Sequence, residues 1–232
     1  MIGLDALVFD VDGVLFDSER VSQQSWLSVS REMGCPQVGE NYLHFVGRSH
    51  ADIQAEMLRL YGPDFPQEEL LARCSRRSRA YMDEYGIPLK PGVRELLDFL
   101  RQQGVLFGLA SSTYYDRTVF RLDQTGLLPY FSVIVTGDMV SHSKPDPEIY
   151  LLACEKLGVE PGRAAAIEDS RNGIRSAHRA GMRTIMVPDL IPPDQSLAPL
   201  IWKTFDSLVQ VRDFLAQEHC VLPLTEKKQS PV

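Results

Sequence analysis

Two aspartates lie close together at the end of a short apolar run near the start of the chain. The run covers residues 6–9, and Asp10, Asp12 and Gly13 follow it. An apolar run of this length is typical of a strand buried on both faces of a parallel sheet, and such sheets bind ligands beyond the carboxyl ends of their strands. Two carboxylates this close repel each other unless a cation lies between them, and Mg²⁺ prefers carboxylate and phosphate oxygens. The spacing indicates a metal site, although an aspartate pair can also simply cap a turn.

Further polar side chains follow later apolar runs. They are Ser111 and Ser112 after the run 105–110, Lys144 in the segment S-K-P-D-P, and Glu168 and Asp169 after the run 164–167. Taken singly, each has an ordinary explanation as a helix cap or a solvated loop cation. Because the carboxyl ends of parallel strands meet at one edge, their joint occurrence predicts a single site that binds phosphate and a metal ion.

The elements that must position these residues alternate from about residue 89 onward. Expected strands cover 105–110, 132–136, 164–167 and 184–187, and expected helices cover 93–103, 116–125, 147–157, 172–180 and a last segment around 208–215. Such alternation indicates a parallel sheet with helices on both faces. The sequence therefore predicts an α/β fold with a doubly wound, Rossmann-like parallel sheet core.

A helical block interrupts this core directly after the first strand. Helical patterns cover residues 19–33, 49–61 and 67–85 without an intervening strand, and the third has an expected apolar face of Leu70, Leu71, Cys74, Tyr81 and Tyr85. The predicted organisation is a core domain of residues 1–17 and 89–221, an inserted all-helical cap domain of residues 18–88, and a flexible tail of residues 222–232.

Composition narrows the class of protein. The net charge of −7 and the pI near 5.3 argue against a nucleic-acid partner. No apolar run approaches membrane-spanning length, so no membrane partner is expected. The four cysteines are scattered and indicate reduced thiols. The N-terminus runs directly into an expected strand without a basic segment and an apolar region before it, and together with the missing membrane-spanning run this predicts a cytoplasmic location.

Taken together, the motifs resemble those of the haloacid dehalogenase-like hydrolase superfamily, in the β-phosphoglucomutase-like and phosphatase subgroup with a helical cap after the first strand. The matching segments are D-V-D-G-V at 10–14, Ser111 after an apolar strand, Lys144 in K-P-D-P, and I-E-D-S with N-G-I at 167–174. The resemblance covers about residues 4–214.

This resemblance implies a phosphatase that hydrolyses a small phosphorylated metabolite, above all a sugar phosphate, as a monomer or weak homodimer. Asp10 would attack phosphorus and form an aspartyl-phosphate, which water then hydrolyses. Asp12 would protonate the leaving alcohol and then accept a proton from water.

The resemblance also implies the binding groups. Ser111, Ser112 and Lys144 would bind the phosphoryl group. Mg²⁺ would be held by the Asp10 side chain, the Asp12 backbone carbonyl and Asp169, with Glu168 bound directly or through water.

Substrate choice is expected to lie in the cap. Arg48 and His50 in G-R-S-H resemble the substrate loop of sugar-phosphate members, and Arg77 could reach a distal anionic group. The alternative for the arginine-rich run around Arg77 is a solvated helix face.

Other activities remain as alternatives. A mutase of the β-phosphoglucomutase type usually carries a histidine at the position aligned with Ser22, which disfavours it. Phosphonatase chemistry needs a cap lysine, whereas the first lysine is Lys90. Haloacid dehalogenases usually lack the second aspartate, which is present here as Asp12. A metal-dependent sugar-phosphate binder without catalysis is the remaining alternative.

Overall fold

The computed structural model describes residues 3–46, 48, 50–190 and 195–217, and it contains a six-stranded parallel sheet in the order β3-β2-β1-β4-β5-β6. The strands are β1 (Ala6–Phe9), β2 (Leu106–Ser111), β3 (Ile134–Thr136), β4 (Ala164–Glu168), β5 (Arg183–Met186) and β6 (Lys203–Thr204). The predicted α/β fold with a doubly wound parallel sheet is confirmed.

The first strand lies in the middle of the sheet, between β2 and β4. All four of its residues are fully buried, as expected for an apolar strand covered on both faces. Phe9 pairs with Leu109 on one side and with Ile167 on the other. This register brings the residues that follow β1, β2 and β4 to the same edge of the sheet.

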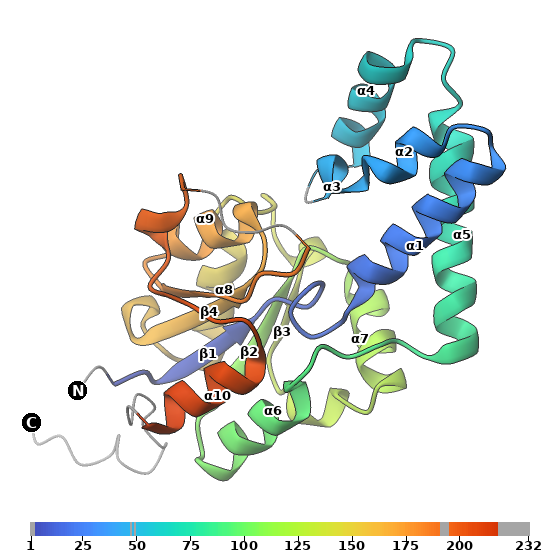
Figure 1. The fold of residues 1–232 in the computed structure, drawn as a ribbon. Coiled ribbons are helices and arrows are strands. Elements are labelled where there is room, and N and C mark those ends of the chain that lie inside the picture. The colour runs from blue at the N-terminus through green and yellow to red at the C-terminus, as the bar shows by residue number, and fades with distance from the viewer. Residues whose placement is uncertain (1–2, 47, 49, 191–194, 218–232) are drawn as a thin grey trace, which may run out of the picture. The chain divides into compact units, whose positions relative to one another are not determined.

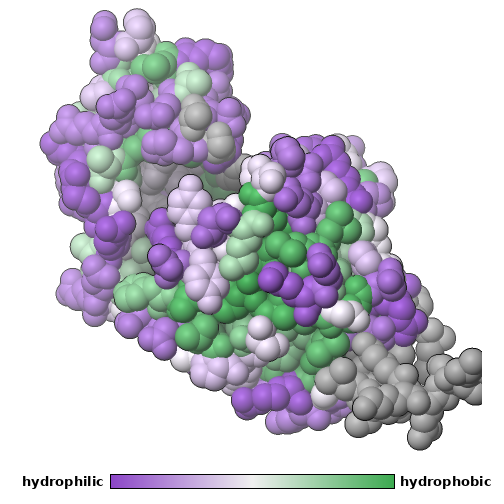
Figure 2. Space-filling view, turned by 180° about the vertical axis from the view of Figure 1, so that it is seen from behind, coloured by the Kyte–Doolittle hydropathy of each residue, from purple (hydrophilic) through white to green (hydrophobic). Residues whose placement is uncertain are grey.

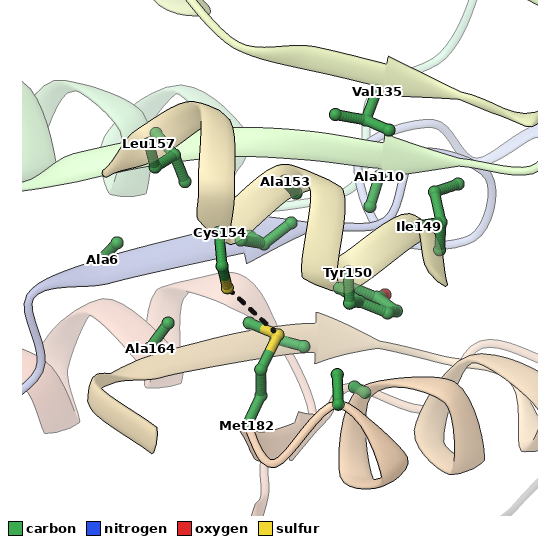
Figure 3. Packing of buried hydrophobic residues seen from close by; sticks show 14 residues of the cluster. Ala6, Ala110, Val135, Ile149, Tyr150, Ala153, Cys154, Leu157, Ala164 and Met182 are labelled. Carbon is green, nitrogen blue, oxygen red and sulfur yellow. Dashed lines mark hydrogen bonds between the residues drawn. The ribbon is translucent and has the colours of Figure 1, made fainter. Parts of the chain in front are cut away.

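Helices cover both faces of the sheet (Figure 1). They are α6 (Val93–Gln102), α7 (Tyr115–Gln124), α8 (Glu148–Leu157), α9 (Arg171–Arg179) and α10 (Leu208–Gln217). α8 and α9 pack on one face, whereas α6 and α10 pack together on the other. Figure 3 shows α8 packed over the strands, with Tyr150, Ala153 and Cys154 in one buried cluster with Ala6 and Ala110.

Residues Asp17–Pro88 form a second compact unit, and the core unit comprises the residues on either side of it, Met1–Phe16 and Leu89–Val232. The described part of this second unit is helical, with α1 (Ser18–Glu32), α2 (Pro36–Glu40), α3 (Tyr42–Phe45), α4 (His50–Tyr61) and α5 (Gln67–Tyr85). The short helices α2 and α3 had no counterpart in the sequence-based assignment, because segments of four or five residues are too short to show a helical period.

The apolar face expected for α5 is wrong at its C-terminal end. Leu70 and Cys74 are buried, but Tyr81 and Tyr85 are exposed to 46% and 68%. The buried stripe continues instead through Ser78, whose hydroxyl donates a hydrogen bond to the Ser25 hydroxyl on α1. The aromatic rings contact each other on the surface.

The core unit differs from the prediction at its edges. The two-residue strand β6 was not predicted, and Ser111 and Glu168 are the last residues of their strands instead of the first residues after them. The predicted tail 222–232 lies outside the described residues.

Large hydrophobic side chains of the core unit, such as Phe120, Met139 and Leu151, are exposed, and Figure 2 shows hydrophobic surface on this unit. Among the described residues, no helix has the length and apolarity needed to cross a membrane.

Candidate active site

Three carboxylates meet at the edge of the sheet where β1 and β4 end. Asp10 directly follows β1, Glu168 ends β4, and Asp169 follows it. One oxygen of each lies within 4.8 Å of the others, an arrangement able to hold a metal ion. The structure thus brings together residues that are about 160 positions apart, as the sequence analysis expected.

Lys144 lies among these carboxylates. Its ammonium group donates to Asp10 Oδ1 at 2.5 Å, to Glu168 Oε1 at 2.7 Å and to the Ala110 carbonyl at 2.9 Å. The side chain is only 5% exposed. A buried ammonium group needs anionic partners, and the loop before α8 supplies the lysine that contacts two of them.

One lysine does not balance three carboxylates. Burial raises the pKa of Asp10 from 3.8 to about 7, and although the charge of Lys144 opposes this rise, the neighbouring charge of Glu168 adds to it. Burial also disfavours the charged form of Lys144, but Asp10 and Glu168 outweigh it and hold the pKa of the lysine above its usual range. The site therefore carries an excess of negative charge that a cation would relieve.

Tyr150 on α8 contacts two residues of the site, and it was not among the residues that the sequence indicated. Its hydroxyl donates to Glu168 Oε1 at 2.6 Å, and Lys144 Nζ lies 4.9 Å from the centre of its ring. Burial and the charge of Glu168 raise the pKa of Tyr150 well above its ordinary value, so it stays a proton donor. Figure 3 shows its side chain on α8, among the residues of the buried cluster.

The other oxygen of Glu168 is also held. Oε2 accepts hydrogen bonds from the hydroxyl of Ser170 at 3.0 Å and from the backbone N–H of Asp169 at 3.2 Å. Ser170 in turn caps α9, because its hydroxyl oxygen accepts from the N–H of Gly173. Glu168 is fully buried and fixed in one orientation.

Two glycines leave space for the carboxylates. Gly13 has φ +82°, a conformation that favours glycine, and a Cβ there would overlap the carboxylate of Asp169. Gly173 lies in the first turn of α9, where a Cβ would overlap the carboxylate of Glu168. The glycines of D-V-D-G-V and N-G-I are therefore required by close approach of the acidic side chains.

Asp12 has different partners from Asp10. Its Oδ1 accepts a hydrogen bond from Arg121 Nη1 at 2.7 Å, and its Oδ2 accepts one from the Thr113 hydroxyl at 3.2 Å. Both oxygens of the Asp12 carboxylate are therefore held by side chains of the core unit. Arg121 was not among the residues indicated by the sequence, because its burial between Thr118 and Leu122 becomes visible only in the folded protein.

The two serines after the second apolar run differ in exposure. Ser111 is 1% exposed, and its hydroxyl oxygen accepts a hydrogen bond from the N–H of Thr113. Ser112 is exposed. Both lie at the edge where β2 ends, next to β1 in the sheet.

The cap residues named in the sequence analysis lie in the helical unit. Arg48 and His50 are exposed, and Arg48 Nε donates to the His44 carbonyl. Arg77 contacts Ser28 and forms an ion pair with Glu32 at 2.6 Å. Arg77 thus has an anionic partner within its own unit, which agrees with the structural alternative for this arginine-rich helix.

A second group of potential metal ligands consists of His142, Asp146 and Glu148. Glu148 accepts hydrogen bonds from the backbone N–H groups of Ser141 and His142, and Asp146 accepts one from the N–H of Glu148. These hydrogen bonds stabilise the loop that leads into α8, and this explains why the three side chains lie close together.

Comparisons with known proteins agree with this geometry. The family model for haloacid dehalogenase-like hydrolases matches residues 7–187. A phosphorylated carbohydrates phosphatase from Thermotoga maritima is 34% identical over 185 residues, which cover 78% of this chain and 84% of that protein. Hexitol phosphatase B from Escherichia coli K12 is 33% identical over 185 residues, covering 79% and 83%.

A solved structure gives the same result. The HAD family hydrolase from Deinococcus radiodurans R1, determined with bound phosphate and sodium, superposes with a TM-score of 0.81 at 30% identity, covering 96% of this chain and all (100%) of that chain. The chain belongs to the haloacid dehalogenase-like hydrolase family. The predicted family and its enzyme class, a hydrolase of the phosphatase type, are confirmed.

The Gly173→Ala substitution should destabilise the protein. The added methyl group overlaps the Glu168 carboxylate, which is held from both sides, so we expect a loss of about 1 to 3 kcal/mol in the free energy of unfolding. Gly162→Ala is the matched control, since a Cβ there meets nothing within 4 Å. Urea unfolding of both variants checks this, and equal stabilities would contradict it.

The titration of Asp10 should appear in the pH dependence of stability. With a pKa of about 7 in the folded protein and 3.8 in the unfolded chain, unfolding releases the Asp10 proton between these values. The resulting stabilisation is complete below pH 3.8 and is lost as the pH rises through about 7. The Asp10→Asn variant lacks this titration. In EDTA, the difference between its free energy of unfolding and that of the wild type should therefore shift in favour of the variant by at most about 4 kcal/mol as the pH rises from 4 to 8.

Urea unfolding at closely spaced pH values measures this gain. Asp116→Asn serves as the control, because Asp116 is exposed on α7. A difference between Asp10→Asn and wild type that stays constant with pH would contradict the raised pKa.

Proposed function

We propose that this protein is a Mg²⁺-dependent phosphatase that hydrolyses a sugar or polyol phosphate through an aspartyl-phosphate on Asp10. The observation that carries the proposal is the group of Asp10, Glu168 and Asp169 at the carboxyl edge of the sheet, two of which, Asp10 and Glu168, form ion pairs with the buried Lys144. This edge is where α/β sheets bind their ligands.

The donor set suits Mg²⁺. Three carboxylates offer hard oxygen ligands, and their charge exceeds that of the single lysine. Asp10 and Asp169 would hold the ion, together with the Asp12 backbone carbonyl, and Glu168 would bind directly or through water. When bound, Mg²⁺ would neutralise the carboxylates and bind phosphate oxygens, so that an anionic substrate can approach.

The side chains divide the remaining work. Asp10 would attack phosphorus while Lys144 offsets the negative charge of both nucleophile and phosphate. Ser111 and Ser112 would donate hydrogen bonds to the transferring group. Asp12 would give a proton to the leaving oxygen and later accept one from the attacking water.

The substrate class is inferred from the relatives. The Thermotoga maritima protein is named for phosphorylated carbohydrates and the Escherichia coli protein for hexitols. A small phosphorylated sugar or sugar alcohol is therefore the proposed substrate, with Arg48 and His50 as proposed recognition residues and Arg77 as a weaker one. A cytoplasmic location and a monomeric or weakly dimeric state stay predictions.

The mutase alternative is not favoured over the phosphatase. Two named relatives are phosphatases, and Ser22 occupies the position where mutases of this type usually carry a histidine. A mutase would convert sugar phosphate into an isomer without releasing inorganic phosphate, so the phosphate-release assay separates the two activities.

The proposed nucleophile is tested by Asp10→Asn. An amide is a poor nucleophile, so release of phosphate from hexose and hexitol phosphates with Mg²⁺ should fall at least about 1,000-fold. Asp116→Asn, the exposed control, should keep wild-type activity. Turnover near the wild-type rate in Asp10→Asn, or no phosphate release by wild type across sugar, polyol and nucleotide phosphates, would contradict the proposal.

Metal binding can be measured without turnover. At a Mg²⁺ concentration about 100 times its dissociation constant, the ion should stabilise the folded protein by about 2.7 kcal/mol, which raises the melting temperature by about 5 to 10 °C. Asp169→Asn should reduce this shift strongly, whereas Asp116→Asn should leave it unchanged. Equal shifts in both variants would contradict the assignment of Asp169 as a ligand.

A further inference from the structure

The core unit buries a guanidinium group beside the site. The Arg121 side chain, on α7 (Figure 1), is 8% exposed and lies on the helix face that also buries Thr118 and Leu122. Burying a permanent charge is costly without an anionic partner. The partner is Asp12, 109 positions away in the sequence, at 2.7 Å.

Arg121 contacts the turn 11–16 at both ends. At its start, Nη1 binds Asp12, and at its end the guanidinium lies over the ring of Phe16, 4.6 Å from the centroid. The turn is closed by hydrogen bonds from the N–H groups of Leu15 and Phe16 to the Val11 carbonyl. Arg121 therefore contacts the side chains of two residues of this turn, one of which is the Asp12 carboxylate.

The carboxylate is held through both oxygens. Arg121 binds Oδ1 and the Thr113 hydroxyl binds Oδ2, so rotation about the side-chain bonds of Asp12 would break at least one contact. Thr113 belongs to the segment after β2 that also carries Ser111 and Ser112. The position of Asp12 is thus tied to the proposed phosphate-binding hydroxyls.

One donor of the guanidinium group, Arg121 Nε, is buried and has no hydrogen-bond partner among the described residues. An unsatisfied buried donor costs free energy, and its persistence calls for an explanation. Lys144 forms ion pairs with Asp10 and Glu168, whereas Asp12 forms its ion pair with Arg121.

We propose that Arg121 is a positioning residue for catalysis, which holds the Asp12 carboxylate where it exchanges protons with the leaving oxygen and the attacking water. This rests on the proposed function. In the first step a P–O bond to Asp10 forms, the P–O bond to the leaving alcohol breaks, and Asp12 gives that oxygen its proton. In the second step water attacks phosphorus, Asp12 takes its proton, and the bond to Asp10 breaks to release inorganic phosphate.

The test compares Arg121→Met, which keeps the length of the side chain, with Arg121→Lys, which restores a charged donor. With a hexose 6-phosphate as substrate, Arg121→Met should lower kcat by about 10- to 100-fold, because a misplaced Asp12 loses part of the rate enhancement that proton transfer provides. KM should change by less than about threefold. Arg121→Lys should recover at least about a tenth of wild-type kcat. Arg163→Met is the control, because Arg163 forms an ion pair with Asp5 before β1, away from the site.

p-Nitrophenyl phosphate separates the two steps, because p-nitrophenolate leaves without needing a proton. The Arg121→Met variant should rapidly release about one equivalent of p-nitrophenolate per enzyme molecule. It should then turn over slowly, because the attack of water on the aspartyl-phosphate still needs Asp12. Thr113→Val, which removes only the contact to Oδ2, should lower kcat in the same direction and to a smaller extent.

Three results would overturn the inference. The first is an unchanged kcat in Arg121→Met, and the second is a fall in kcat/KM that comes from a higher KM. The third is an equal fall in kcat in the methionine and lysine variants, which would indicate a purely structural ion pair. A folded Arg121→Lys keeps the test decisive if Arg121→Met does not fold. Failure of the proposed function itself is distinguishable, because Asp10→Asn would then release p-nitrophenolate at the wild-type rate.

Discussion

An imbalance of buried charge is the constraint on which the site depends. Three carboxylates come within 4.8 Å of one another where β1 and β4 end, and one ammonium group lies among them. Burial raises the pKa of Asp10 to about 7, and the neighbouring charge of Glu168 adds to this rise while the contact with Lys144 opposes it. Such a concentration of negative charge is costly, and a bound cation would lower that cost.

The surrounding structure keeps these carboxylates in place against their repulsion. Glu168 receives donors on both oxygens, from Lys144 and Tyr150 on one and from the Ser170 segment on the other. Gly13 and Gly173 leave room where a side chain would strike a carboxylate. The parallel sheet contributes rigidity, since its central strands are fully buried and in register.

Two cations divide the acidic groups between them. Lys144 binds the carboxylates assigned to nucleophilic attack and metal binding, and Arg121 binds the one assigned to proton transfer. A lysine provides a compact charge that can contact several oxygens, whereas a guanidinium is rigid and always charged. The separation gives neighbouring aspartates, only two residues apart, different surroundings and different proposed roles.

The sequence alone determined the order of elements, the inserted helical block and the residues of the sheet edge, because buried strands, helical periods and strand-end motifs are local patterns. Asp10, Lys144, Glu168 and Asp169 could be predicted together because parallel strands place their carboxyl ends at one edge. The tertiary structure decided what depends on distant packing. Tyr150 reads in sequence as an ordinary core residue of α8, and Arg121 as one more charge on an amphipathic helix. Only the folding of α7 and α8 against the sheet brings their polar groups to Asp12 and Glu168, over 109 and 18 positions, and no local pattern encodes these contacts.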